Sequence, residues 1–169
     1  MTLGPSKVYL LDAQLERNEI AEQESVFANI TTQKYWDSTG FQFPLNSTLT
    51  SPFGAFRTFN DSYNTRHTGW DFQAAMGTPI MSIAAGKVVF SAPMQIYGNH
   101  VIVDHGYGVF STYSHFSIVH VTQGEMVTKG QIIGEVGDTG RTTGPHFHWE
   151  VAVNGNFVDG VQFEQMWMP

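Results

Sequence analysis

Apolar and polar residues alternate along the second half of the chain in short runs, a pattern typical of β-strands that bury one face. In the clearest run, His146–Val153, the odd-numbered positions are all apolar, whereas His146, His148 and Glu150 share the opposite face. Runs of this kind predict strands at Lys87–Ala92, Val101–Asp104, Val109–Phe116, Gln131–Val136 and His146–Val153.

Glycine-rich and asparagine-rich segments separate these runs and are typical of hairpin loops. They are Tyr97–Asn99, His105–Gly108, Gly137–Gly140 and Asn154–Asn156. Because the strands are short and no helical pattern lies between them, the sequence predicts a mainly β domain. Its antiparallel sheet is expected to fold as a barrel or a sandwich.

The first 40 residues follow a different pattern. Segment 12–34 contains no glycine or proline, and its apolar residues recur at broadly helical intervals. This predicts a helix with Asp12 as its N-cap, preceded by a short strand at Lys7–Leu10. We therefore expect an N-terminal helical arm or linker at 1–40 and a β domain at 41–169. A packing or linking role is the simpler interpretation of the arm, and an inhibitory or partner-binding role is the alternative.

Composition excludes several classes of protein. The chain has 169 residues and a net charge of -7, and its basic residues form no cluster in the sequence, so no nucleic-acid surface is predicted. No apolar run is long enough to cross a membrane. Cysteine is absent, so any metal must be bound by histidine and carboxylate. The apolar run Val8–Leu11 is too short for a signal peptide, so any export signal is expected to lie outside this chain.

Histidines and carboxylates gather in several of the predicted elements. On the polar face of His146–Val153, successive side chains stand about 7 Å apart. That spacing is too wide for a direct hydrogen bond, but it suits one histidine binding a metal while the other reaches a substrate. In an extended segment, His67 and Asp71 share a face and can converge on one ion. Alternation also places His115 on the same face as Tyr113, although each motif alone fits an ordinary polar strand face.

The combination is more specific than its parts. A catalytic zinc takes three nitrogen or oxygen ligands from the protein and keeps one position open. His67, Asp71 and either His146 or His148 supply that set, which leaves the other histidine and His115 to move protons. Zinc lowers the pKa of bound water from about 15.7 to about 7 and polarises a carbonyl. The residues therefore indicate metal-assisted hydrolysis of an amide.

Ten segments carry a resemblance to a known family. They are Ser51–Gly54, Arg66–Phe72, Gly77–Ile80, Gly86–Val89, Val103–Gly108, Thr112–Phe116, Gly124–Val127, Gly130–Gly134, Gly137–Gly140 and Thr143–Glu150. The resemblance that they carry covers about residues 43–160. The chain resembles the zinc endopeptidases of the lysostaphin and LytM type, which cut peptide bridges in bacterial peptidoglycan.

The resemblance implies zinc as the cofactor, with His67, Asp71 and His148 as its ligands. It implies that His115 and His146 lie beside the metal, activate water and steady the oxyanion. It also implies an antiparallel β fold with a groove across one sheet, and an endopeptidase that hydrolyses peptide crosslinks of peptidoglycan. Stem or bridge peptides of the wall are then the expected partners. The cell envelope, whether periplasm, cell surface or exterior, is the expected location.

Three further residues are candidates for supporting roles. Glu150 shares the metal-side face and is predicted to orient a ligand. Arg66 is expected either to hold a loop or to contact a substrate carboxylate. Tyr63 lies upstream of the first ligand, as a tyrosine does in some relatives, but its spacing does not match and it stays outside the catalytic set.

The remaining histidines receive structural interpretations. His105 is predicted to be structural in a turn, and His100 and His120 are predicted to be solvated residues at strand ends.

Two alternatives to an enzyme are considered. The first is a catalytically silent wall-binding or amidase-activating domain on the same fold, and the presence of all five site positions argues against it. The second is a biotinyl or lipoyl carrier, which Gly124–Gly134 resembles, but the modifiable-lysine motifs of such carriers are absent. Glycyl bridges and D-alanyl–diaminopimelate crosslinks both stay open as substrates, and the sequence does not indicate an oligomeric state.

Overall fold

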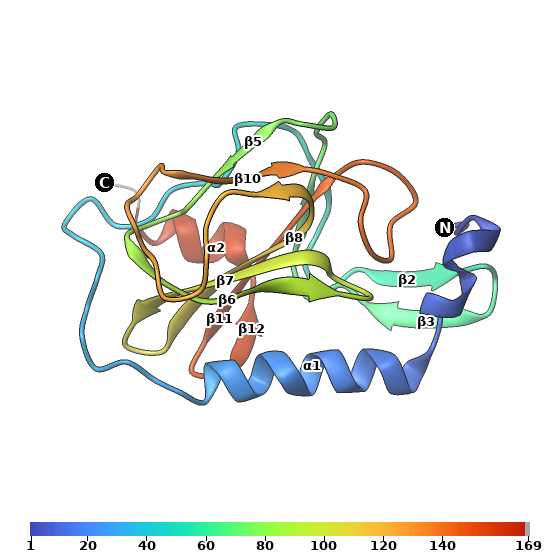
Figure 1. Ribbon diagram of the computed structural model, residues 1–169, viewed down its shortest axis with the longest axis horizontal. Helices are drawn as coiled ribbons and strands as arrows, with labels where there is room; N and C mark the ends of the chain where they lie inside the picture. The colour runs from blue at the N-terminus through green and yellow to red at the C-terminus, as the bar shows by residue number, and fades with distance from the viewer. Residues whose placement is uncertain (168–169) are drawn as a thin grey trace.

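The strands with the strictest alternation form the centre of the molecule. The computed structural model describes residues 1–167, and Figure 1 shows its elements. The strands are β1 (Leu49–Ser51), β2 (Phe56–Phe59), β3 (Tyr63–Arg66), β4 (Trp70–Phe72), β5 (Pro79–Met81), β6 (Gly86–Met94), β7 (Gly98–Gly106), β8 (Val109–Val119), β9 (Met126–Val127), β10 (Ile132–Val136), β11 (Phe147–Val153) and β12 (Asn156–Val158). All five predicted strands are therefore present within a few residues of their expected bounds.

The strands pair antiparallel in a large sheet and a small one. The large sheet has ten strands and follows the path β1–β4–β11–β8–β7–β6–β9. Strand β10 pairs with both β8 and β5, so the sheet folds over itself, and β2 and β3 form the small sheet. The predicted mainly β, antiparallel architecture is confirmed.

Three helical segments complete the described chain: η1 (Pro5–Leu10), α1 (Ala13–Phe27) and α2 (Gly160–Gln165). The prediction of a strand at Lys7–Leu10 is wrong, because this segment is a 3₁₀ helix with a proline in its first turn. Asp12 caps α1 as predicted, since its side chain accepts from the backbone N–H groups of Gln14 and Leu15. Among residues 1–167, no helix combines the length and apolar character needed to cross a membrane.

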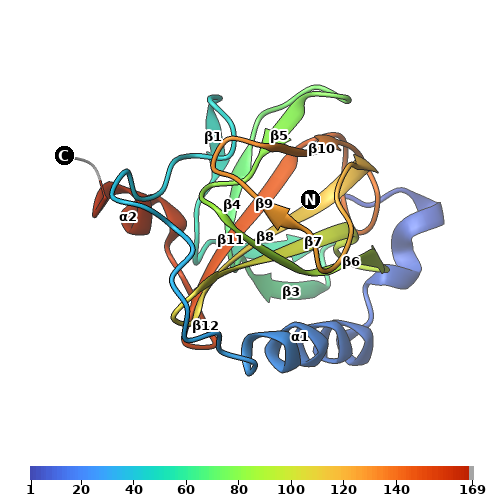
Figure 2. The ribbon, with the colours of Figure 1, turned by 60° about the vertical axis from the view of Figure 1, so that its left-hand side comes forward.

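Helix α1 ends earlier than predicted because the following chain pairs with the β7–β8 hairpin. The backbone N–H of Tyr35 donates to the His105 carbonyl at 3.0 Å, and that of Tyr107 donates to the Thr31 carbonyl at 2.7 Å. The helix itself runs along one side of the sheet in both ribbon views (Figures 1 and 2). Phe27 packs there against Phe110 with ring centroids 5.2 Å apart.

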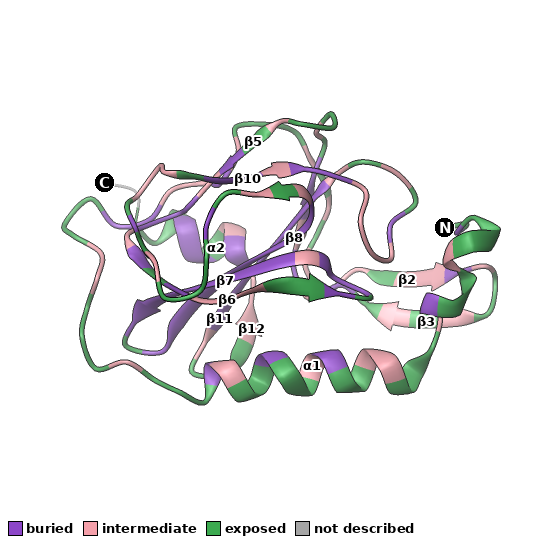
Figure 3. Ribbon diagram, in the orientation of Figure 1, coloured by how far each residue is buried: buried purple, intermediate pink, exposed green. Residues whose placement is uncertain are grey.

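The main core lies on the opposite side of β11 from its polar face. As the alternation predicts, Phe147, Trp149 and Val151 are buried in this core. Figure 3 shows the same concentration of buried residues along the central strands. The apolar side of β11 thus anchors the sheet and leaves His148 and Glu150 to face the other way.

Strand β8 contains a β-bulge at His115, and this corrects the predicted alternation. Tyr113 pairs with Val101 and Phe116 pairs with Asn99, so three steps on β8 match two on β7. His115 takes up the extra residue with a φ of 64°, in the left-handed region. Tyr113 and Phe116 therefore both enter the main core, and His115 does not share a face with Tyr113.

Two loops differ in an informative way. Asn154 and Gly155 form the predicted hairpin turn between β11 and β12, with φ values of 50° and 80°. In contrast, Gly137–Gly140 is not a hairpin. It opens a longer loop to β11 that an isolated bridge between Gly137 and His146 closes.

Candidate metal centre

Two histidines and an aspartate, remote in sequence, bring one atom each to a common point. His67 follows β3, Asp71 lies in β4, and His148 lies in β11 directly opposite Asp71 in the sheet register. The distance from His67 Nε2 to His148 Nδ1 is 2.9 Å. Asp71 Oδ1 lies 3.0 Å from His67 Nε2 and 2.9 Å from His148 Nδ1. All three residues are buried.

Gly69 allows β4 and β11 to approach closely enough for this meeting. A Cβ at this position would lie 2.2 Å from the Trp149 carbonyl oxygen, well inside contact distance. Glycine is therefore required here by the neighbouring backbone.

Each of the three residues has a second partner that orients it. His67 Nδ1 donates to the Pro52 carbonyl at 2.9 Å, so the lone pair of Nε2 faces the common point. The second oxygen of Asp71 accepts from Arg57. His148 Nε2 lies 3.1 Å from Glu150 Oε1, which leaves His148 Nδ1 on the inner side.

Glu150 is fully buried yet ionised. Burial raises the pKa of its carboxyl, but the charge and hydrogen bond of His148 and the two threonine hydroxyls lower it to about 2. Those hydroxyls belong to Thr68 and Thr112 and donate at 2.5 and 2.6 Å. The expectation that side chains along this face stand too far apart to bond is wrong for His148 and Glu150, because the two side chains lean toward each other.

The electrostatics of the cluster favour a positive centre. Burial lowers the pKa of His148, but the charge of Glu150 and hydrogen bonds from His148 to Asp71 and Glu150 outweigh it and raise this pKa to about 9. Burial also raises the pKa of Asp71, yet the neighbouring imidazoles of His148 and His67 hold it far below its usual range. A proton or a metal cation satisfies such a site.

The donor set fits zinc. Zinc–nitrogen and zinc–oxygen bonds of about 2.0–2.1 Å in a tetrahedron separate neighbouring ligand atoms by roughly 3.3 Å. The three observed separations, 2.9, 3.0 and 2.9 Å, are close to that edge and need only a slight spreading.

His115 and His146 lie beside the cluster with their rings 5.0 Å apart. His115 Nδ1 donates to the Thr139 carbonyl at 2.8 Å, and His146 Nδ1 donates to the Gly144 carbonyl at 2.9 Å. Both Nε2 atoms are therefore free of a proton, and that of His146 lies 3.8 Å from Asp71 Oδ1. Burial lowers the pKa of both imidazoles, which are neutral at pH 7.

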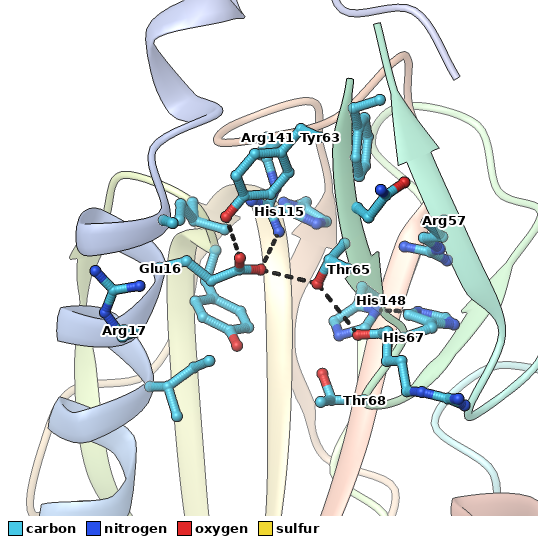
Figure 4. Close-up of a pocket in the computed structure, with 17 residues that line it drawn as sticks. Glu16, Arg17, Arg57, Tyr63, Thr65, His67, Thr68, His115, Arg141 and His148 are labelled. Carbon is cyan, nitrogen blue, oxygen red and sulfur yellow. Dashed lines mark hydrogen bonds and ion pairs between the residues drawn. The ribbon is translucent and has the colours of Figure 1, made fainter. Parts of the chain in front are cut away.

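A cleft of about 410 Å³ opens between α1 and the β2–β3 hairpin, and His67, His115 and His148 line it (Figure 4). Tyr63 and Arg66 line it, but their hydrogen bonds lead away from the ligand atoms. The Tyr63 hydroxyl donates to the Glu16 carboxylate, and Arg66 Nη1 donates to the Gly54 carbonyl at 3.3 Å. Glu16 also accepts from Arg141 at 2.6 Å.

Sequence reasoning missed several of these partners. Arg57, Glu16 and Arg141 stand in no recognisable spacing, so only the folded chain reveals that they reach the site. Pro52 and Thr112 lie inside segments that carry the family resemblance. The resemblance of those segments is the sequence signal that could have identified these two partners.

The other histidines divide as follows. His105 is buried and bonded to Ala85 and Ser111, as its structural interpretation requires. His120 is exposed, as predicted, and pairs with Glu135. The prediction of a solvated His100 is wrong, because its side chain is fully buried against Phe90, Tyr97 and Ser114.

Comparison with known proteins assigns the chain to a family. The model of peptidase family M23 matches residues 65–160, which include the five candidate site residues. The chain belongs to peptidase family M23. The family is zinc-dependent, and the His–Asp–His cluster has the matching donor set.

Similar proteins are named as peptidases, one of them as a peptidoglycan endopeptidase. The chain is 42% identical over 114 residues to the DD-carboxypeptidase/endopeptidase Mpg of Neisseria meningitidis, covering 67% of this chain and 26% of Mpg. It is 40% identical over 96 residues to the peptidoglycan DD-endopeptidase ShyA of Vibrio cholerae, covering 57% of this chain and 22% of ShyA. The chain thus spans about a quarter of the length of these curated relatives.

Solved M23 structures share the fold. A zinc-containing peptidase from Vibrio cholerae superposes with a TM-score of 0.66 and 30% identity, covering 75% of this chain and 39% of that one. The catalytic domain of lysostaphin from Staphylococcus simulans superposes with a TM-score of 0.63 and 30% identity, covering 71% of this chain and 93% of that one. The resemblance to lysostaphin-type enzymes is confirmed.

Proposed function

We propose that this chain is a zinc-dependent endopeptidase that hydrolyses peptide crosslinks of bacterial peptidoglycan. The observation that carries the proposal is the meeting of three ligand atoms, within 3.0 Å of one another, beside two further imidazoles at an open cleft. A silent wall-binding domain has no need of this complete set. Because relatives are named DD-endopeptidases, the favoured bond is a crosslink between D-amino acids. Such a substrate places the site of action in the cell envelope.

The proposed zinc ligands are His67 Nε2, Asp71 Oδ1 and His148 Nδ1. When bound, zinc supplies a Lewis acid that polarises the peptide carbonyl and makes water acidic enough to attack at neutral pH. Glu150 and Arg57 hold the ligands His148 and Asp71 in the orientations that the site needs.

His115 and His146 are the proposed proton carriers. Their Nδ1 protons are held by backbone carbonyls, so Nε2 is the atom that can accept a proton from attacking water. Once protonated, either imidazole can donate to the oxyanion or to the leaving amine. Because burial keeps both neutral at pH 7, they begin the reaction in the accepting form.

Three variants and a wall digest test this proposal. Zinc content is measured by elemental analysis, and fragments released from purified walls of known crosslink chemistry are weighed by mass spectrometry. We expect about one zinc per chain, and crosslinked fragments converted to monomers. His148→Ala should lose both zinc and activity, whereas His146→Ala should retain zinc and lose at least about a hundredfold in rate. His120→Ala is the control and should match the wild type.

Two outcomes would contradict the proposal. A His148→Ala protein with full zinc and full activity would disprove the ligand assignment. A zinc-loaded wild type that releases nothing from any wall would favour the silent domain.

A further inference from the structure

All four arginines of the chain line the cleft beside the metal centre. They are Arg17, Arg57, Arg66 and Arg141, and they come from α1, β2, β3 and the β10–β11 loop. The chain as a whole has a net charge of -7, so the positively charged lining of the cleft is opposite in sign to the net charge of the protein. Among the described residues that line the cleft, Glu16 is the one carboxylate.

Two of the four guanidinium groups are already paired. Arg57 bonds to Asp71, and Arg141 bonds to Glu16 while it stacks over the rings of Phe59 and Tyr63. These two arginines belong to the walls of the cleft.

The other two, Arg17 and Arg66, are exposed and have no acidic partner within residues 1–167. Arg17 bonds only to Gln14 on its own helix, at 2.8 Å, and Arg66 only to the Gly54 carbonyl. Figure 4 shows Arg17 on the α1 side of the cleft, across from the β2–β3 side that carries Arg66. Two open guanidinium groups therefore border the cleft from opposite walls.

We propose that this cleft binds the carboxylate-bearing part of a peptide substrate, and that Arg17 and Arg66 determine this specificity. The inference rests on the proposed endopeptidase function. A guanidinium binds a carboxylate through paired, charge-assisted hydrogen bonds, and a cleft lined by one sign of charge concentrates ligands of the opposite sign. Stem peptides that carry free carboxyl groups fit this site, whereas a neutral glycyl bridge offers the arginines no partner. Helix α1 then forms part of the substrate site.

The test compares two peptides with the same scissile bond, one with free carboxyl groups and one with those groups amidated. For zinc-loaded wild type, we expect kcat/KM to be about tenfold higher for the free acid at low salt. Arg17→Gln and Arg66→Gln should each raise KM for the acid about fivefold or more, with kcat and the amidated peptide almost unaffected. Lys87→Gln removes the same charge on β6, outside the cleft, and is the matched control.

Binding provides a readout that does not depend on turnover. Titration of both peptides into the zinc-loaded His146→Ala variant should show the same preference for the acid, lost when Arg17 is also replaced. Equal affinity for both peptides, unchanged by either arginine substitution, would overturn this inference and leave the endopeptidase proposal intact. Failure of the wild type to cut any wall peptide, with the binding preference retained, would instead count against the endopeptidase proposal alone.

Discussion

At the scale of single residues, each proposed zinc ligand is held by one partner, which leaves one particular atom free to face the common point. His67 is held by a backbone carbonyl, Asp71 by Arg57 and His148 by Glu150. Glu150, the partner of His148, has the largest desolvation cost, because its carboxylate is 0% exposed. A buried carboxylate is stable only when its oxygens accept hydrogen bonds. Thr68 and Thr112 meet that requirement.

Replacement of this carboxylate tests its role. We expect Glu150→Gln to weaken zinc binding by about 10- to 100-fold, because the neutral amide no longer favours a positive centre next to His148. Competition with a chromophoric zinc chelator measures the affinity. Glu22→Gln, on an exposed position of α1, is the control and should bind zinc as the wild type does. Unchanged affinity in Glu150→Gln would show that the charge of Glu150 does not contribute to zinc binding.

At the scale of elements, α1 is anchored to the sheet by one buried carboxylate. Glu19, on this helix, accepts from the backbone N–H groups of three consecutive residues in the β6–β7 turn. These are Gln95, Ile96 and Tyr97, and their N···O distances range from 2.5 to 3.4 Å. The sequence interpretation of a packing helix agrees with this contact, and the division at residue 40 stays a prediction.

Truncation of this anchor should destabilise the protein. Glu19→Ala leaves buried N–H groups without an acceptor, so we expect the free energy of unfolding to fall by about 2–3 kcal/mol. Urea denaturation followed by far-UV circular dichroism measures the change. Glu22→Ala, which removes an exposed carboxylate one turn along, should stay within about 0.5 kcal/mol of the wild type. Equal effects of the two substitutions would contradict the anchor.

The β-bulge in β8 also acts at the scale of elements, because it changes which side chains of the strand face the core. By adding one residue to the strand, it turns His115 toward His146 and His148 while Tyr113 and Phe116 stay in the core. A left-handed backbone conformation at a non-glycine residue is energetically unfavourable. The hydrogen bonds and packing of the surrounding sheet hold His115 in it. The backbone N–H of His115 is satisfied by the Tyr97 carbonyl at 2.8 Å.

At the scale of the whole molecule, stability depends on a buried histidine outside the proposed catalytic set. His105 is fully buried between the Ala85 carbonyl and the Ser111 hydroxyl, and its ring meets Phe41 edge-on at 5.4 Å. Burial lowers the pKa of His105 from 6.5 to about 4. The folded protein therefore holds this imidazole neutral where the unfolded chain would protonate it.

The sign of the pH effect follows from that difference. Between pH 6.5 and 4 the unfolded chain binds more protons, so stability is complete above this window and is lost as the pH falls through it. From pH 7 to pH 5, His105 should cost the wild type about 2 kcal/mol. Urea denaturation at both pH values, with a chelator present so that zinc loss does not contribute, measures the change. In His105→Gln the decrease should be smaller by that amount, and an identical decrease would rule out His105 as its source.

Local pattern alone determined much of this protein. A period of two placed His148 and Glu150 opposite the apolar face of β11, and the absence of cysteine limited any metal to histidine and carboxylate ligands. The turn signal at Asn154 and Gly155 was equally local. These features need only neighbouring residues, because side-chain direction in a strand follows from backbone geometry.

Only the tertiary structure decided the rest. The bulge at His115 shifts the inward and outward alternation of side chains along β8. Nothing in the local sequence predicts it, because the bulge depends on pairing with a different strand. The burial of His100, the partners Arg57 and Glu16, and the gathering of four arginines at one cleft depend on contacts between separate strands, helices and loops. Such contacts form because α1 and the loops pack against the sheet. The periodicity of residues within one segment carries no information about that packing.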